Sequence, residues 1–344
     1  MKSVTIRHVA EEAGVSLQSV SRVINNGPNV TDALRDRVRA AIDKLGYVPN
    51  MAARRMGGSK SYLLIAFNDR EPTLEKWRAG RGSDWVAQML LGAMPRCEAD
   101  GYHLLLELLD GHQARLHQRV DAIVSSLRPD GVILTPPHSQ DAAILDRLDA
   151  RRVPYARLSA GGGDARGHRI EMDENEAAAV ATRHLIGLGH RRIGFLAGSA
   201  DYAVSGVRLA GFRRAMTEAG LTVAPELVQE GEFSFESGLA AADALLALKD
   251  RPTAVIASSD EQALAMLHRA GDAGLAVPDA LSLVSFDDTP PVSFSLPALT
   301  AIRHPTAAMA ERAAALLIEG AAPDGTVHVL PFEFVVRGST ARPG

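Results

Sequence analysis

The chain has 344 residues, is 46% apolar and carries a formal net charge of −4, so it is long enough for two or three domains with a sizeable core. No run approaches about 18 consecutive apolar residues, and the N-terminus lacks an apolar signal-peptide core, so neither a membrane span nor export is expected. The lone cysteine, Cys97, excludes an internal disulfide framework and predicts a cytoplasmic location.

The charge is divided unevenly along the chain. Residues 1–60 hold ten Lys/Arg and five Asp/Glu, which gives this segment a net charge of +5. Because the whole chain has a net charge of −4, residues 61–344 carry a net charge of −9. A small basic head on a large acidic body indicates a nucleic-acid contact confined to the head. A solvated basic face without a partner is the alternative.

The head is expected to contain three short helices. Thr5 caps the first, which covers residues 6–13, and Gly14 ends it. Ser16 caps the second, and Thr31 caps the third, whose apolar residues recur every three or four positions until Gly46. Two short helices joined by Gly-Val-Ser form a helix-turn-helix pattern.

The second helix presents a polar, basic side that fits the DNA major groove. Arg22 can pair with guanine, Gln18 with adenine, and Leu17 can pack on a thymine methyl group. Thr5, Ser16, Ser21, Asn25 and Thr31 are expected beside phosphates or as helix caps. A small helical bundle that binds no DNA remains the alternative.

The segment "PNMAARRMGGSKS", residues 49–61, allows a helix of under two turns, which is marginal by itself in water. From "VTIRHVAEEAGVSLQSVSRVINNGP" to "MAARRM" the chain closely resembles the lactose/galactose repressor family of bacterial transcription regulators. The resemblance implies a DNA-binding domain at 1–49 and a hinge helix with its linker at 50–60. Leu17, Gln18 and Arg22 would then read bases. The hinge would place Asn50, Ala53, Arg54, Arg55 and Met56 at the minor groove, with Met56 where leucine is usual.

In the body, residues 61–344, strand-like and helix-like segments alternate. "SYLLIAF", "YHLLLELL", "DGVILTPP" and "VPYARLS" read as buried parallel strands, separated by helices at 84–99, 113–128 and 139–151. A second series contains helices at 174–188, 204–219, 236–248, 260–273 and 306–319. Its strands are "RRIGFLAG", "TAVIAS", "LSLVSF", "LTAIRHP" and "FEFVVRGST". The pattern predicts two doubly wound parallel sheets in two lobes, with a ligand between them. Residues 68–83 are expected to form a long polar loop.

Polar and aromatic residues that follow the strands form the candidate ligand site. They are Asn68, Trp85, His138, Asp173, Arg208, Phe233, Ser259 and Asp287. Carboxylates and arginine hydrogen-bond vicinal hydroxyls, and rings cover apolar C–H faces, so a sugar is favoured. Asp173 and Asp260 are equally expected to cap the helices that follow them, and Trp85 is equally expected to be ordinary core.

The family resemblance continues through "LIGLGHRRIGFLAG", "RLAGFRRAM" and "SFDDT". It implies a periplasmic-binding-protein-like effector domain. The first lobe would cover about 61–172 and 303–331, and the second about 173–302 and 332–344. Arg208 and Asp287 would grip ligand hydroxyls, Phe233 would stack on the ligand, and Ser259 stands where asparagine is common.

The resulting hypothesis is a repressor whose homodimer binds a palindromic double-stranded operator and is released by a small sugar. The absence of leucine heptads after the body favours a dimer over a tetramer. A purine-like corepressor and a small-molecule binding protein without a DNA role remain alternatives. No enzyme motif, metal site, cofactor or membrane contact is expected.

Overall fold

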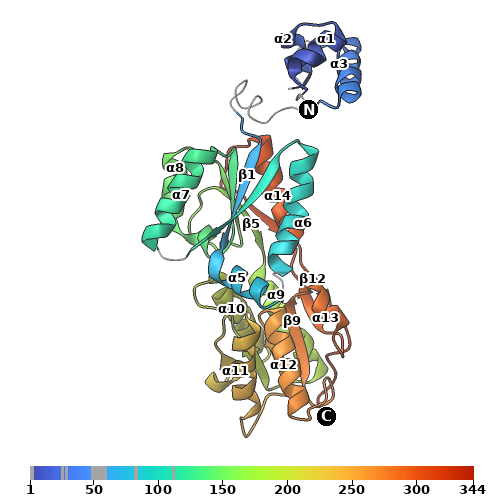
Figure 1. Cartoon of the computed structure of the whole chain (residues 1–344). Coiled ribbons are helices and arrows are strands. Elements are labelled where there is room, and N and C mark those ends of the chain that lie inside the picture. The colour runs from blue at the N-terminus through green and yellow to red at the C-terminus, as the bar shows by residue number, and fades with distance from the viewer. Residues whose placement is uncertain (1–3, 25–26, 28–29, 48–59, 81–83, 111–112) are drawn as a thin grey trace. The chain divides into compact units, whose positions relative to one another are not determined.

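A computed structural model describes residues 4–24, 27, 30–47, 60–80, 84–110 and 113–344. The chain divides into two compact units, a head that ends at Tyr62 and a body that runs from Leu63 to Gly344. Figure 1 labels the helices and strands of both units. Of the helices in these described ranges, none is long and apolar enough to cross a membrane.

The head is a bundle of three helices, α1 (Ile6–Ala13), α2 (Leu17–Ile24) and α3 (Asp32–Leu45). The Ser16 hydroxyl accepts a hydrogen bond from the Ser19 N–H at 3.1 Å, which starts α2. The Thr31 hydroxyl does the same for the Leu34 N–H at 3.3 Å and starts α3. Gly14 ends α1 with φ of 60°, a conformation that glycine adopts without a Cβ clash. The apolar stripes meet in one core around Val9, Val20 and Val38.

The first lobe of the body is built on a six-stranded parallel sheet of order β11-β5-β4-β3-β1-β2. Its strands are β1 (Leu63–Asp69), β2 (His103–Leu109), β3 (Gly131–Leu134), β4 (Tyr155–Leu158), β5 (His168–Met172) and β11 (Val327–Leu330). Helices α7 (Gln113–Leu127) and α8 (Ala142–Ala150) cover one face of the sheet. Helices α6 (Asp84–Ala99) and α14 (Thr306–Glu319) lie side by side on the other (Figure 1). Helices therefore bury both faces of this sheet, which explains the apolar runs of its strands in the sequence.

The second lobe repeats this plan with the order β12-β10-β9-β8-β6-β7, in which only β12 is antiparallel to its neighbour. Its strands are β6 (Ile193–Leu196), β7 (Val228–Gln229), β8 (Ala254–Ala257), β9 (Ser282–Asp287), β10 (Thr300–Arg303) and β12 (Glu333–Val335). Helices α11 (Phe235–Leu246) and α12 (Asp260–Asp272) cover one face. Helices α9 (Glu174–Leu188) and α10 (Ala203–Glu218) cover the other, and the short α13 (Pro290–Phe294) follows β9.

The chain passes between the lobes three times, after Met172, after Arg303 and after Leu330. Both sheets are doubly wound and parallel-dominated, which confirms the predicted fold class. In such sheets the carboxyl ends of the strands carry the ligand-binding loops. Those ends are where the residues of the candidate site lie.

The expectation of a loop at 68–83 is wrong for residues 68–78, of which the first two belong to β1. Helix α5 (Arg70–Arg78) follows β1 directly. Its sequence, REPTLEKWR, has only two large apolar residues and therefore no apolar stripe that periodicity could detect. Pro72 sits in the first turn, where a backbone N–H has no helical partner in any case.

Other elements also differ from the sequence-based expectation. The predicted helix at 139–151 is a short 3₁₀ turn, η1 (His138–Gln140), followed by α8. The break occurs because the Asp141 carboxylate accepts the Ala143 and Ile144 N–H groups at 2.9 and 3.2 Å, and so caps α8. Strands β5 and β11, which pair with each other, were not expected. The last strand-like run pairs only at Glu333–Val335.

Candidate nucleic-acid interface and effector cleft

Helix α2 carries the predicted base-reading residues on its solvent side. Val20 and Val23 face the head core, whereas Leu17, Gln18 and Arg22 are exposed. Within the described residues, no side-chain hydrogen bond or ion pair holds Gln18 or Arg22. The exposed apolar surface of Leu17 is unfavourable in water, and next to the solvated Arg22 it suits a groove that offers methyl groups and acceptors.

The other predicted DNA contacts divide into two groups. Thr5, Ser16 and Thr31 lie at helix starts, and the hydroxyl groups of Ser16 and Thr31 already serve as caps. Ser21 is half-buried on α2. The remaining predicted contacts lie outside the described residues; they are Asn25, Asn50, Ala53, Arg54, Arg55 and Met56.

In the first lobe, Asn68 at the end of β1 lies close to His138, which follows β3. The Thr135 hydroxyl donates to Asn68 Oδ1 at 2.6 Å, and Asn68 Nδ2 donates to Thr73 Oγ1 on α5 at 3.3 Å. Burial lowers the pKa of His138, although the nearby Asp69 carboxylate opposes this shift. The His138 Nε2 atom is buried and has no partner among the described residues. Burial therefore favours the neutral imidazole, whose Nε2 has no hydrogen-bond partner among the described residues.

In the second lobe, Arg208 is almost fully buried. Its Nε donates to Glu174 Oε2 at 2.7 Å, and its Nη1 donates to the Ser258 carbonyl at 2.6 Å. The guanidinium lies 4.4 Å from the centre of the Phe286 ring. Glu174 Oε1 also lies 3.2 Å from His304 Nε2. Burial by itself would raise the pKa of Glu174, but Arg208 and His304 hold it below its usual range.

Asp287 closes β9 beside this charge pair. Its φ of 98° lies in the left-handed region, which costs energy for any residue with a Cβ and recurs at functional sites. Asp260 lies next to it and is buried, and it receives hydrogen bonds from the Ser285 hydroxyl and the Thr289 N–H. Burial and the charge of Asp287 raise the pKa of Asp260. Among the described residues, the Asp287 carboxylate has no hydrogen-bond or ion-pair partner.

Phe233 connects this cluster to the first lobe. It has φ of 57°, and its backbone carbonyl accepts the Ser259 hydroxyl at 3.1 Å. Its ring packs edge-on against Tyr202, 5.6 Å between centroids, and lies so close to Gly198 that a Cβ there would be 1.9 Å from it. The Tyr202 hydroxyl in turn donates to Asp69 Oδ2 in the first lobe at 3.0 Å.

A second contact joins the lobes at the start of α10. The Ala203 N–H, which is free of helical partners at this position, donates to Gln140 Oε1 of the first lobe at 3.3 Å. A third is the ion pair between Lys76 of α5 and Glu261 of α12, 2.8 Å apart. In the first lobe these contacts involve Asp69 and Gln140, which lie next to Asn68 and two residues after His138.

Several depressions mark the surface of the described part of the body. One of about 550 Å³ is lined by Trp85 and Asp287 and by the crossover residues His304 and Phe332. A smaller one of about 280 Å³ is lined by Asp173, whose Oδ1 accepts the Glu176 N–H at 2.8 Å and thus caps α9.

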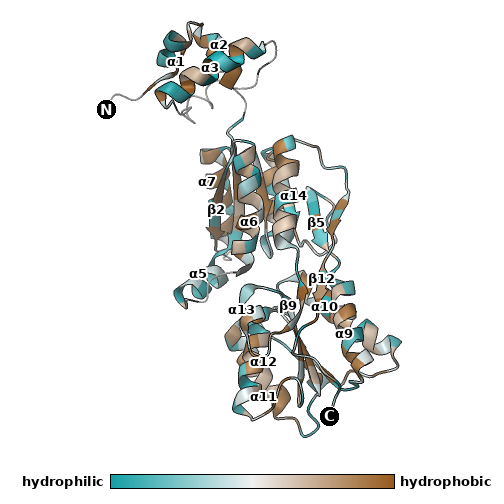
Figure 2. Ribbon diagram, turned by 90° about the vertical axis from the view of Figure 1, so that its right-hand side faces the viewer, coloured by the Kyte–Doolittle hydropathy of each residue, from teal (hydrophilic) through white to brown (hydrophobic). Residues whose placement is uncertain are grey.

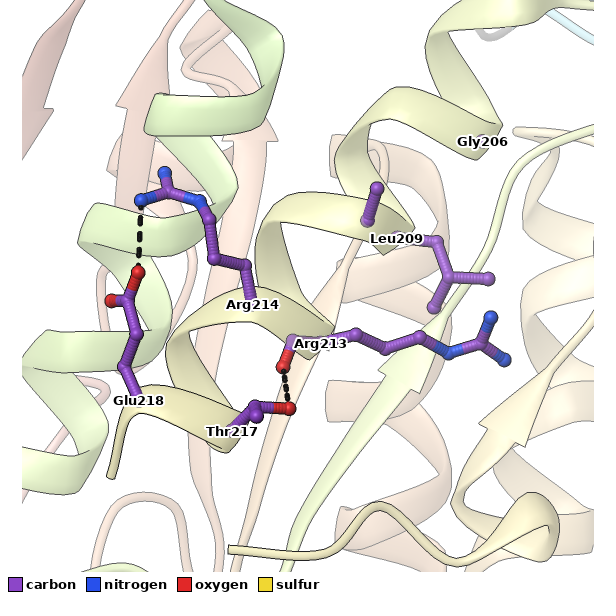
Figure 3. A pocket seen from close by; sticks show the side chains of 7 residues that line it. Gly206, Leu209, Arg213, Arg214, Thr217 and Glu218 are labelled. Atoms are coloured by element: carbon purple, nitrogen blue, oxygen red, sulfur yellow. Dashed lines mark hydrogen bonds and ion pairs between the residues drawn. The ribbon is translucent and has the colours of Figure 1, made fainter. Parts of the chain in front are cut away.

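The third depression, also about 550 Å³, lies along the exposed side of α10 (Figure 3). Arg214 and Glu218 pair there at 3.3 Å, and the Thr217 hydroxyl donates to the Arg213 carbonyl at 2.9 Å. This is the solvated face of a single helix, because all of its lining residues come from α10. The depression with Trp85 and Asp287 is the candidate effector cleft.

Six of the predicted effector residues form a set with two parts, Asn68 and His138 in the first lobe and Arg208, Phe233, Ser259 and Asp287 in the second, next to the contact between Tyr202 and Asp69. Of these six, Asp287 lines the candidate effector cleft, together with the predicted Trp85. The sequence reading missed Glu174, Tyr202 and His304, which hold this set in place. Glu174 directly follows the predicted Asp173, so a second acidic residue at the crossover was the available signal. Within the described ranges, no group of three or more His, Cys, Asp or Glu lies in position to hold a metal ion.

Comparisons with known families match both units. The profile described as "Bacterial regulatory proteins, lacI family" matches residues 5–50. The profile described as "Periplasmic binding protein-like domain" matches residues 182–340. The first match contains the helix-turn-helix, and the second contains Arg208, Phe233, Ser259 and Asp287.

Several curated proteins are similar over nearly the whole chain. The HTH-type transcriptional repressor PurR of Photobacterium profundum is 31% identical over 318 residues, 92% of this chain and 91% of that protein. The HTH-type transcriptional regulator CelR of Thermobifida fusca is 32% identical over 320 residues, with 92% and 91% covered.

Among solved structures, a transcriptional regulator CelR–cellobiose complex has a TM-score of 0.73 and 31% identity, and 98% of this chain and 99% of that chain are covered. A lac repressor dimer bound to operator and the anti-inducer ONPF has a TM-score of 0.79 and 26% identity, with 99% and 100% covered.

Proposed function

Because this chain belongs to the lacI family of bacterial regulatory proteins, and is thus a DNA-binding transcriptional regulator rather than an enzyme, we propose that it is a sugar-responsive repressor. Its homodimer binds a palindromic operator through Leu17, Gln18 and Arg22. A small sugar then enters the interlobe cleft and releases the operator.

The observation that carries the effector proposal is the free Asp287 carboxylate. The neighbouring cation, Arg208, is already neutralised by Glu174, so the cleft offers an acceptor in excess. Vicinal hydroxyl groups supply the donors that this acceptor needs, and Trp85 supplies a ring for the apolar face of a sugar. The relative crystallised with cellobiose supports the same ligand class.

A homodimer is supported by exposed apolar side chains on both lobes. Leu91 and Met94 on α6, and Phe294 and Leu296 at and after α13, are each more than half exposed. Exposed apolar groups of this size mark interaction surfaces. Analytical ultracentrifugation should find a dimer, and Leu296→Asp should shift it toward monomer.

The effector is tested by thermal unfolding across mono- and disaccharides and purine bases, since a ligand well above its Kd raises the midpoint by mass action. Fluorescence anisotropy on operator DNA selected from a randomised pool then reports release. Asp287→Ala should abolish the response to the sugar and leave operator affinity intact. The matched control is Asp272→Ala, a carboxylate that is 55% exposed on α12. If only purine bases raise the unfolding midpoint, the effector is a purine-like corepressor and the proposed sugar inducer is wrong.

A further inference from the structure

Helix α5 begins at the edge of the sheet where the effector cleft lies. It follows β1 without a break, and its Thr73 receives the hydrogen bond from Asn68 of the candidate site. Figure 2 shows α5 as a largely hydrophilic helix that stands out from the first lobe. The helix is therefore fixed to the candidate site near its start, while most of its remaining residues are exposed.

One face of α5 is turned toward the second lobe. Residues three and four positions apart share a helix face, so Thr73, Lys76 and Trp77 lie together. Thr73 is buried, and Lys76 reaches across to Glu261 on α12. The other oxygen of Glu261 accepts the Phe235 N–H at 3.1 Å, next to the loop that carries Phe233. Trp77 thus directly follows the lysine of an ion pair that joins the two lobes near the loop that carries Phe233.

Trp77 is 44% exposed, although tryptophan usually buries most of its surface. A flat apolar ring beside a partly exposed Lys–Glu pair has the composition of a sugar platform. The ring covers the C–H face, and the ammonium and carboxylate groups bond the hydroxyl groups. One helical turn, about 5.4 Å, separates Trp77 from Thr73. A second sugar ring attached to one bound near Asn68 would span this step.

Resting on the proposed sugar effector, we propose that Trp77, with the Lys76–Glu261 pair, forms an outer subsite that selects effectors of two or more sugar units. Because Lys76 and Glu261 belong to different lobes, a ring held there contacts both of them. The outer ring thereby contributes to closure of the cleft as well as to affinity.

Calorimetric titration of the full-length protein tests this subsite. The probes are glucose and galactose as monosaccharides, and cellobiose, maltose and lactose as disaccharides. Trp77→Ala should weaken disaccharide binding about tenfold, which corresponds to the stacking of one aromatic ring. It should leave monosaccharide affinity within about twofold. Trp77→Phe should restore most of the loss, and Glu75→Ala, on the opposite exposed face of α5, should have no effect.

The outcomes separate this inference from the proposed function. Unchanged disaccharide affinity in Trp77→Ala, or an equal loss for both probe classes, would overturn the subsite. Binding of monosaccharides alone by the unmodified protein would overturn the subsite while the sugar effector stands. If no saccharide binds, the sugar effector fails and the subsite fails with it, and operator binding is unaffected.

Discussion

Removal of the Glu174 carboxylate should destabilise the body strongly. The Glu174 and Arg208 side chains are 6% and 5% exposed and lie 2.7 Å apart, so Glu174→Ala leaves a guanidinium buried with only a backbone carbonyl as its polar partner. Breaking a buried pair from one side costs about 3–5 kcal/mol. With an m value of about 3 kcal/mol/M, the urea midpoint followed by circular dichroism should fall by roughly 1–1.7 M.

The matched control is Asp243→Ala. Asp243 pairs with Arg269 at 3.0 Å but is 58% exposed, and exposed pairs contribute less than about 1 kcal/mol. A Glu174→Ala variant no less stable than this control would refute the assignment of a buried, mutually dependent charge pair. The double variant with Arg208→Ala should lose less stability than the two single variants add up to, because the second change removes the uncompensated charge.

Three other predictions concern close packing and pH. Gly198→Ala should weaken effector affinity in calorimetry and leave operator affinity unchanged, because its Cβ would displace the Phe233 ring at 1.9 Å; normal effector binding would contradict the assigned place of Phe233. Gly92→Ala should lower the free energy of unfolding by several kcal/mol, measured in urea, because its Cβ would lie 1.8 Å from the backbone oxygen of Ala307. The pKa of His138 is lowered by burial, so the unfolded chain binds a proton first as pH falls below about 6.5. Stability should fall from that pH downward by at most about 1.4 kcal/mol per pH unit for this group, and His138→Asn should reduce the slope in urea titrations.

The sequence predicted the elements whose signals are local. The head helices were placed by capping residues such as Ser16 and Thr31 and by glycines, and the buried strands by apolar runs. Helix α5 was missed because it buries little and so shows no periodicity. Strand β11 was missed because a short, partly exposed edge strand resembles a loop until its partner is known, whereas the alternating HRIEM of β5 was an available strand signal.

For the candidate site, position after a strand was the useful signal. It identified Arg208 and Asp287, since the carboxyl ends of parallel strands meet at one edge. It did not identify the partners of Arg208, because Glu174 and His304 come from separate crossovers more than a hundred residues apart. Such a charge pair depends on tertiary contact, for which a single sequence carries no spacing rule.

The contacts between the lobes have a kinetic consequence. Tyr202 with Asp69, Gln140 with Ala203, and Lys76 with Glu261 must part before a molecule can pass between the lobes. Association would then consist of an opening step followed by capture. Its observed rate would rise with effector concentration and level off at the rate of opening. The maximum rate at which transcription responds to a rising effector concentration would then equal the rate at which these three polar contacts open. This maximum would not depend on how tightly the effector binds.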